Sequence, residues 1–228
     1  MTQTDHVATA RASYDATAEV YAQLVGTELT AATEGPLDRA LLAAFVELVG
    51  RAPAHRVADV GCGPGRVAAF LAAHDIEVVG VDVSRAMLAV ARAAHPGIHF
   101  EEGRLTALPV PDRSLAGAVC WYSVIHTPPE HLRGVCAELV RVLAPGGHLL
   151  VAFQAGTGER VHRAEVYGTR VSLTSYRHSP DEVVRCLTEA GLEISARAVR
   201  QPEFAHESTP QAFVLARAGG LAGSSITR

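Results

Sequence analysis

The chain has 228 residues, with 20 Lys and Arg against 24 Asp and Glu, and therefore a formal net charge of −4. This length suits one large α/β domain, and a hydrophobic content of 48% is ordinary for a globular protein. The acidic balance argues against a nucleic-acid partner, because nucleic-acid-binding proteins normally present a basic face.

Targeting and membrane patterns are absent from the sequence. The opening "MTQTDHVATARASYD" lacks a basic start followed by an apolar block, and no apolar stretch reaches about 18 residues. The four cysteines stand far apart and form no CxxC pair, which argues against a zinc site or a disulfide framework. We therefore expect reduced thiols, no metal, no membrane partner and a cytoplasmic location.

Two helical patterns come first, over residues 7–25 and 37–49, with the breaker "TEGP" between them. Short apolar runs then alternate with helical patterns. The expected strands are 56–60, 76–83, 98–103, 115–122 and 148–154, and the expected helices are 65–74, 84–94 and 128–143. A further helix is capped by Ser179 and closed by Gly191, and two strands follow, the last over residues 210–218.

This alternation predicts a doubly wound, Rossmann-like parallel sheet with helices on both faces. In such sheets ligands lie beyond the carboxyl ends of the strands. The ends of interest are residues 59–65, Asp82, 103–104, 122–126 and the segment from Gln154 onward.

The stretch "ADVGCGPGRVAAF", residues 58–70, contains a glycine-rich turn between a strand and a helix. Its glycines follow the spacing G-x-G-x-G and Arg66 comes next, whereas the dinucleotide fingerprint is G-x-G-x-x-G. Asp59 beside the turn would repel a pyrophosphate by about 4 kcal/mol at a separation of about 4 Å and an effective dielectric of about 20. A ligand with an ammonium, a carboxylate and a nucleoside fits this turn better, and S-adenosylmethionine is such a molecule.

Asp82 ends the second expected strand, 17 positions after Gly65. A carboxylate at this place can accept hydrogen bonds from both hydroxyls of an adenosine ribose. NAD would use the same feature, so Asp82 indicates an adenosine without separating the two cofactors. Ser84, two residues later, is expected to cap the following helix.

Several motifs in this order resemble the class I S-adenosylmethionine-dependent methyltransferases, small-molecule type, with the ubiquinone and menaquinone methyltransferases nearest. They are "VADVGCGPG", "VGVDVS", "ALPVPDRSLAGAV" and "RVLAPGGHLLVAF", preceded by a Y-D-x-x-A-x-x-Y helix that starts at Tyr14. The resemblance implies seven strands with the last antiparallel. It also implies a single domain over residues 1–218, with a helical cap at 1–50, a substrate lid at 155–178 and a disordered tail at 219–228.

The resemblance also implies roles for individual residues around S-adenosylmethionine. The expected cofactor contacts are Tyr14, Tyr21, Asp59, Gly61, Cys62, Gly63, Gly65, Asp82, Val83, Met87, Gly103, Arg104, Leu105, Trp121 and Tyr122. Two positions depart from the family pattern: Arg104 stands where an acid often contacts the adenine amino group, and "SLA" at 114–116 replaces "SFD". Because a guanidinium offers only donors, we expect the backbone near Arg104 to frame the base.

Methyl transfer from a sulfonium needs mainly alignment and desolvation, and a base helps only certain acceptors. Two histidines are the candidate catalytic residues: His126, just after the fourth strand, and His162, in the segment expected to cover the substrate. Candidate substrate contacts in that segment are Arg163, Tyr167 and Tyr176.

We therefore predict a methyltransferase that acts on O, N or C of a small-molecule acceptor, and natural-product metabolism is one setting for such a reaction. An NAD-dependent oxidoreductase and a non-methylating S-adenosylmethionine-binding protein are the alternatives. The acceptor has no recognisable code in the sequence, and the sequence leaves open whether the chain forms a homodimer.

Overall fold

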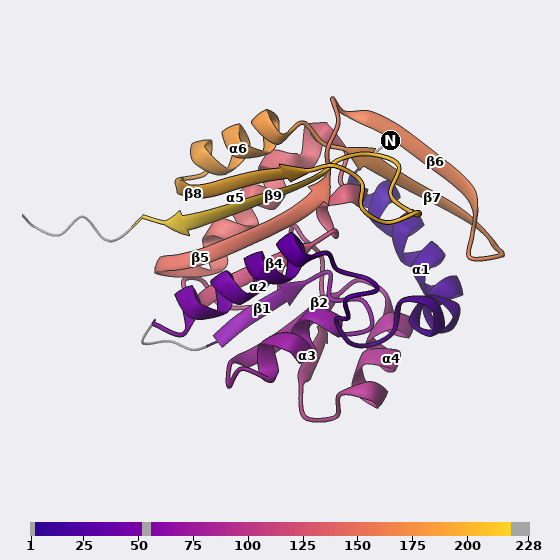
Figure 1. The fold of residues 1–228 in the computed structure, drawn as a ribbon, viewed down its shortest axis with the longest axis horizontal. Helices are drawn as coiled ribbons and strands as arrows, with labels where there is room; N and C mark the ends of the chain where they lie inside the picture. Colours follow the sequence, from indigo (N-terminus) through magenta and orange to yellow (C-terminus); the bar gives the residue numbers. More distant parts are fainter. Residues whose placement is uncertain (1–2, 52–55, 220–228) are drawn as a thin grey trace, which may run out of the picture.

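The structure is a computed structural model that describes residues 3–51 and 56–219. Its centre is a seven-stranded sheet in the order β3-β2-β1-β4-β5-β9-β8, in which β9 runs antiparallel to both of its neighbours (Figure 1). The strands are β1 (Arg56–Val60), β2 (Glu77–Asp82), β3 (His99–Glu102), β4 (Leu115–Trp121), β5 (Leu143–Gln154), β8 (Leu192–Arg200) and β9 (Gln211–Ala218). The predicted fold class, including its antiparallel last strand, is confirmed.

Helices cover both faces of the sheet and bury two separate cores against it. Side chains of α2 (Pro36–Val49), α3 (Arg66–Ala72) and α4 (Arg85–Ala94) pack in one core, while α5 (Leu132–Val142) and α6 (Pro180–Glu189) pack in the other. The strands β1, β4 and β5 are therefore buried on both sides, which explains their nearly continuous apolar sequences. None of the described helices is long and apolar enough to span a membrane.

The first helix, α1 (Gln3–Val25), packs against α4 and against the hairpin β6–β7. This hairpin, formed by β6 (Glu159–Val166) and β7 (Thr169–Arg177), is a separate two-stranded antiparallel sheet and extends along one side of α1 (Figure 1). Hairpin and helix thus stand together near the carboxyl ends of the central strands. The sequence predicted a covering segment at 155–178 but not that it would be two strands.

Local signals placed most helix ends correctly. The Ser84 hydroxyl accepts a hydrogen bond from the Met87 amide at 3.1 Å, and the Ser179 hydroxyl accepts one from the Glu182 amide at 3.4 Å. Gly191 has φ +102°, the left-handed conformation expected after a helix. The predicted tail at 219–228 lies outside the described residues except for its first position.

One boundary prediction was wrong. The expected helix over 128–143 begins only at Leu132, after a 3-10 turn over Pro129–His131, and β5 already begins at Leu143. The segment 144–147, between the expected helix and the expected strand at 148–154, belongs to an irregular part of β5 that bulges against β4. Gly147 permits this pairing, because a Cβ there would lie only 3.0 Å from the Leu115 carbonyl oxygen.

Candidate active site

A cavity of about 600 Å³ lies over the carboxyl ends of β1, β2 and β4, where the strand order reverses. This is the place at which a doubly wound sheet binds its ligand. Residues of α1, of the loop before α2 and of the hairpin β6–β7 complete its walls. The predicted site residues that line it are Tyr14, Tyr21, Gly61, Gly63, Asp82, Val83, Met87, Arg104, Leu105, Trp121, Tyr122, His126, Arg163 and Tyr167.

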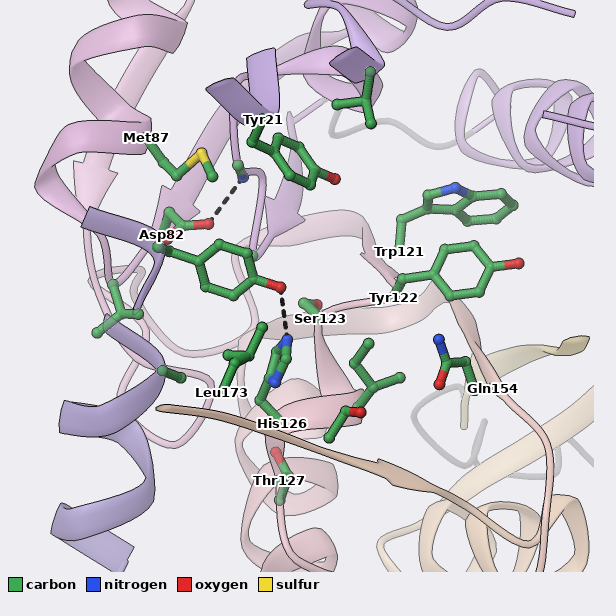
Figure 2. A pocket seen from close by; sticks show the side chains of 18 of the residues that line it. Tyr21, Asp82, Met87, Trp121, Tyr122, Ser123, His126, Thr127, Gln154 and Leu173 are labelled. Atoms are coloured by element: carbon green, nitrogen blue, oxygen red, sulfur yellow. Dashed lines mark hydrogen bonds between the residues drawn. The ribbon is translucent and has the colours of Figure 1, made fainter. Parts of the chain in front are cut away.

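The glycine turn is held in place by close packing and by the carboxylate of Asp82. Gly61 has φ +75°, and a Cβ there would lie 2.1 Å from Cβ of Ser123, so this position requires glycine. The amides of Gly63 and Ser84 donate to the two oxygens of Asp82, each at 2.8 Å, and Figure 2 marks one of these bonds. Each oxygen retains a lone pair, so Asp82 can still accept hydrogen bonds from ribose hydroxyls.

Asp59 does not lie in the cavity, contrary to its predicted contact with the cofactor. Its side chain is 1% exposed, and Oδ2 accepts a hydrogen bond from the Ala68 amide at 2.9 Å, in the first turn of α3. Burial is the largest cause that raises the pKa of Asp59, to about 7, and the nearby Asp82 carboxylate adds to it. The last-but-one position of β1 directs this side chain beneath the turn, so Asp59 caps α3 instead of facing a ligand.

Three further predicted cofactor residues lie outside the cavity lining. Cys62 is buried, and a Cβ on Gly80 would lie 3.1 Å from its Sγ. Gly65 has φ +88° and packs close to Phe100. A Cβ on Gly103 would lie 2.6 Å from Val81, so this residue faces the core. These positions shape the backbone beneath the site.

One end of the cavity is an apolar slot suited to an adenine ring. Val83, Met87 and Leu105 line it, and the Met87 side chain is 2% exposed. Arg104 also lines the cavity, and its backbone forms a bridge with Ala107 through two hydrogen bonds of 3.3 and 2.9 Å. An ordered backbone edge therefore stands at the position where the family pattern has an acid.

Arg66 follows the glycine turn at the position where the dinucleotide fingerprint has its third glycine. In the structure this charged residue lines the cavity. Its guanidinium forms an ion pair with Glu34, and the two side chains are 13% and 5% exposed. Tyr21 from α1 adjoins this pair, and its pKa is raised by burial and lowered in part by Arg66. A buried guanidinium beside the glycine turn can bind a carboxylate. The sequence could have indicated this role, because Arg66 is the first residue of the helix that follows the glycine turn.

Tyr14 and His126, 112 residues apart in sequence, form a hydrogen bond of 2.7 Å between Oη and Nε2 (Figure 2). Nδ1 of His126 lies 2.8 Å from the carbonyl oxygen of Thr174 on β7. A carbonyl can only accept, so Nδ1 carries the proton and Nε2 accepts the phenol proton of Tyr14. The imidazole thus links α1 to the hairpin through one fixed tautomer.

The neutral imidazole makes folding sensitive to pH. Burial lowers the pKa of His126 to about 4, and the hydrogen bond to Thr174 opposes it only partly. In the unfolded chain His126 takes up a proton near its ordinary pKa of about 6.5. The neutral imidazole therefore makes its full contribution to the free energy of unfolding above that pH, and this contribution is lost as the pH falls towards about 4. We expect His126→Gln to remove up to about 3 kcal/mol of the acid-induced loss in the free energy of unfolding.

Urea denaturation at pH 7.5 and pH 4.5 measures this difference. His162→Gln is the matched control, since His162 is exposed on the hairpin. The same acid-induced loss in His126→Gln as in the unmodified chain would contradict the assignment.

The hairpin brings only two of its four predicted residues into the cavity. Arg163 and Tyr167 line it, and the Tyr167 ring meets Tyr21 edge-on at a centroid distance of 5.5 Å. His162 is exposed, does not line the cavity, and lies 3.3 Å from the Thr174 hydroxyl through Nδ1. Alternation along β6 turns it away, so the structure does not support its predicted catalytic role. Tyr176 is 7% exposed and stacks on His178, outside the cavity.

Sequence reasoning missed a buried ionic cluster at the other end of the cavity. Arg200 at the end of β8 donates to both oxygens of Asp38 at 2.9 and 2.8 Å and to both oxygens of Glu207 at 2.7 and 2.6 Å. The three side chains are 10%, 2% and 8% exposed. All three line the cavity, but nothing in the local sequence pairs residues that lie 162 positions apart.

The sequence also did not indicate the role of Asp15. It accepts hydrogen bonds from the Ser84 hydroxyl at 2.7 Å and from the Ala86 amide at 3.1 Å. A carboxylate at a helix N-terminus is electrostatically favourable, so Asp15 fastens α1 to the start of α4. This contact holds the neighbouring Tyr14 over the cavity.

Comparisons with known proteins agree with this geometry. Residues 57–147 match the family described as "Methyltransferase domain". A trans-aconitate 2-methyltransferase of Methylobacterium nodulans is 39% identical over 117 residues, which cover 49% of this chain and 43% of that protein. A phthiotriol/phenolphthiotriol dimycocerosates methyltransferase of Mycobacterium ulcerans is 34% identical over 148 residues, 63% of this chain and 52% of that protein. The chain thus spans about half the length of these relatives.

Among solved structures, a 1,6-didemethyltoxoflavin-N1-methyltransferase of Burkholderia thailandensis with bound S-adenosylhomocysteine matches with a TM-score of 0.71. The match covers 96% of this chain and 91% of that one at 17% identity, so it concerns the fold. The strand order and the glycine turn joined to Asp82 agree with the match of residues 57–147 to a methyltransferase domain, and the chain has the fold of solved S-adenosylmethionine-dependent methyltransferases.

Proposed function

We propose that this chain transfers the methyl group of S-adenosylmethionine to an oxygen, nitrogen or carbon atom of a small-molecule acceptor. The observation that carries the proposal is one continuous cavity that joins the glycine turn and Asp82 to the Tyr14–His126 pair. A nucleoside-binding turn and a separate polar centre are the two parts that group transfer to a second molecule requires.

The chemistry of the cavity fits the proposed cofactor. Asp82 would accept from the ribose, the apolar slot of Val83, Met87 and Leu105 would hold the adenine, and Arg66 would pair with the methionine carboxylate. Bound S-adenosylmethionine would supply an electrophilic methyl group on sulfur.

The contribution of the chain to the reaction would be alignment and exclusion of water. Tyr14 keeps its phenol proton directed at Nε2 of His126, and burial holds the pKa of Tyr14 well above its ordinary value. The pair therefore presents a fixed, uncharged edge to the reaction centre. The hairpin β6–β7 would act as the lid through Arg163 and Tyr167. We infer that His126 acts through Tyr14 and orients the acceptor, and that Tyr14 also contacts the cofactor.

The small-molecule acceptor and the cytoplasmic location belong to this proposal. The relatives from Methylobacterium nodulans and Mycobacterium ulcerans are named for small-molecule substrates, which supports the acceptor class. All four cysteines are buried and free, which is consistent with a reducing compartment.

Binding of S-adenosylhomocysteine tests the proposal directly. A ligand at 100 times its dissociation constant adds about 2.7 kcal/mol to the free energy of unfolding, so we expect a clear rise in the melting temperature. Isothermal titration calorimetry gives the dissociation constant, and NADH is the matched control ligand. Stabilisation by NADH and not by S-adenosylhomocysteine would support the oxidoreductase alternative and reject the proposal. Binding without methyl transfer to any of a broad acceptor panel would support a non-methylating role.

A further inference from the structure

Trp121 and Tyr122, predicted from sequence as cofactor contacts, lie on the opposite side of the cavity from the nucleoside-binding residues. Figure 2 shows Asp82 and Met87 on one side, Trp121 and Tyr122 on the other, and His126 between them. Gln154, the last residue of β5, also lines the cavity, and Figure 2 draws its side chain on the same side as Tyr122. These residues therefore face the part of the cavity that lies across its centre from the ribose site.

The polar atoms of both rings are buried and lack a hydrogen-bond partner among the described residues. Nε1 of Trp121 and Oη of Tyr122 have almost no exposed surface, and the Trp121 side chain as a whole is 8% exposed. An indole N–H can only donate, so its partner must offer a lone pair. Buried polar groups in folded proteins are normally paired, so these two donors need a partner that the described residues do not supply.

The backbone at Tyr122 is also unusual. Its φ is +58°, a left-handed conformation that bulky L residues rarely adopt, and its amide donates to the Ala152 carbonyl at 2.9 Å. Strained residues of this kind gather at ligand sites, where the surrounding structure holds them in place. The turn after β4 thus holds the Tyr122 ring in the wall of the cavity at a conformational cost.

The charges around the Tyr122 phenol select against an anion. The five N–H groups of Arg200 are all used, by Asp38, by Glu207 and by the Gln201 carbonyl, so none remains for a ligand. One guanidinium against two carboxylates leaves this cluster with a formal charge of −1. Burial, and then the Asp38 carboxylate, raise the pKa of Tyr122, which keeps its phenol protonated as a donor.

We propose that Trp121, Tyr122 and Gln154 form the recognition site of the acceptor, and that they bind a neutral, planar group through its carbonyl oxygen or ring nitrogen. The indole N–H and the phenol O–H would donate to that atom, and the aromatic rings would pack against the planar group. The inference rests on the proposed function, because it takes the nucleoside side of the cavity as the place of S-adenosylhomocysteine.

Three fragments test the inference on protein saturated with S-adenosylhomocysteine. Chromone is planar and neutral with a carbonyl, 1-naphthoate has a similar size with a carboxylate, and indole lacks a strong acceptor atom. Isothermal titration calorimetry gives the affinities. Trp121 is the only tryptophan of the chain, so a change in its emission on addition of chromone reports whether that fragment reaches this site. We expect chromone to bind most tightly and to change that emission.

Tyr122→Phe removes one hydroxyl and keeps the ring. We expect this variant to bind chromone about three- to tenfold more weakly, which is the effect of losing one neutral hydrogen bond. Its affinity for S-adenosylhomocysteine should be unchanged. Tyr176→Phe is the matched control, because that ring is buried outside the cavity, where it stacks on His178. It should leave the chromone affinity unchanged.

Three results would overturn the inference. The first is that chromone does not bind to the protein loaded with S-adenosylhomocysteine, and the second is that 1-naphthoate binds more tightly than chromone. The third is that Tyr122→Phe lowers the affinity for S-adenosylhomocysteine by as large a factor as the affinity for chromone. Failure of S-adenosylhomocysteine to bind the unmodified chain is a different result, which rejects the proposed function itself.

Discussion

Asp82→Ala is expected to weaken the binding of S-adenosylhomocysteine by about 10²–10⁴-fold, measured by isothermal titration calorimetry. The substitution removes two acceptor oxygens for ribose hydroxyls, and hydrogen bonds to a charged group contribute about 1.5–3 kcal/mol each. It also frees the amides of Gly63 and Ser84, which loosens the turn that meets the ligand. Both effects act in the same direction.

Two variants separate these effects. Asp82→Asn keeps one acceptor oxygen and the shape of the side chain, so its loss of affinity should be intermediate. Glu77→Ala is the matched control, because Glu77 is an exposed acid at the opposite end of the same strand, and it should leave the affinity unchanged. A folded Asp82→Ala protein with the affinity of the unmodified chain would contradict the assignment of Asp82 to the ribose.

Arg200→Met is expected to lower the free energy of unfolding at pH 7 by about 3–5 kcal/mol, as urea denaturation would show. Methionine fills much of the same volume but leaves the carboxylates of Asp38 and Glu207 buried and without a counter-charge. Arg200 also connects β8 to α2 and to the loop before β9, so the loss extends across one wall of the cavity. The surface pair of Arg197 with Asp181 offers the control, and Arg197→Met should cost less than about 1 kcal/mol.

The pH dependence gives an independent check on the same cluster. Burial raises the pKa of Glu207, but hydrogen bonds from Arg200 and from the backbone outweigh it and lower the pKa to about 2. In the unmodified chain the ionised Glu207 therefore contributes to the free energy of unfolding above about pH 4.5, and this contribution is lost as the pH falls towards about 2. In Arg200→Met the carboxylates lose their cation and take up protons more readily, so the penalty should shrink at pH 4.5. A penalty that is constant or larger at pH 4.5 would count against an electrostatic origin.

Much of the fold follows from local signals in the sequence. Alternation of apolar strands with helical patterns predicted a doubly wound sheet, and serines placed before helices predicted the caps at Ser84 and Ser179. These signals succeed because they depend on neighbours within about one helical turn. The hairpin β6–β7 was missed because most of its side chains are exposed and show no strong alternation of apolar residues.

The candidate site divides in a similar way. The sequence by itself determined the glycine turn, Asp82 at the end of the next strand, and the class of nucleoside that this arrangement suits. These are properties of short segments in which backbone geometry and charge lie side by side along the chain. The sequence could not show that the Asp59 side chain turns beneath α3, because the direction of a side chain relative to the cavity depends on how its strand is packed.

Only the tertiary structure decided which distant side chains meet. The Tyr14–His126 bond and the Asp38–Arg200 pair join residues 112 and 162 positions apart, and no periodicity or spacing encodes such contacts. The same holds for Trp121 and Tyr122, whose polar atoms are buried across the cavity from Asp82 and have no hydrogen-bond partner within residues 3–51 and 56–219. Hydrogen bonds and buried charges act over a few ångströms, so their partners are settled by the packing of whole elements, after local propensity has formed those elements.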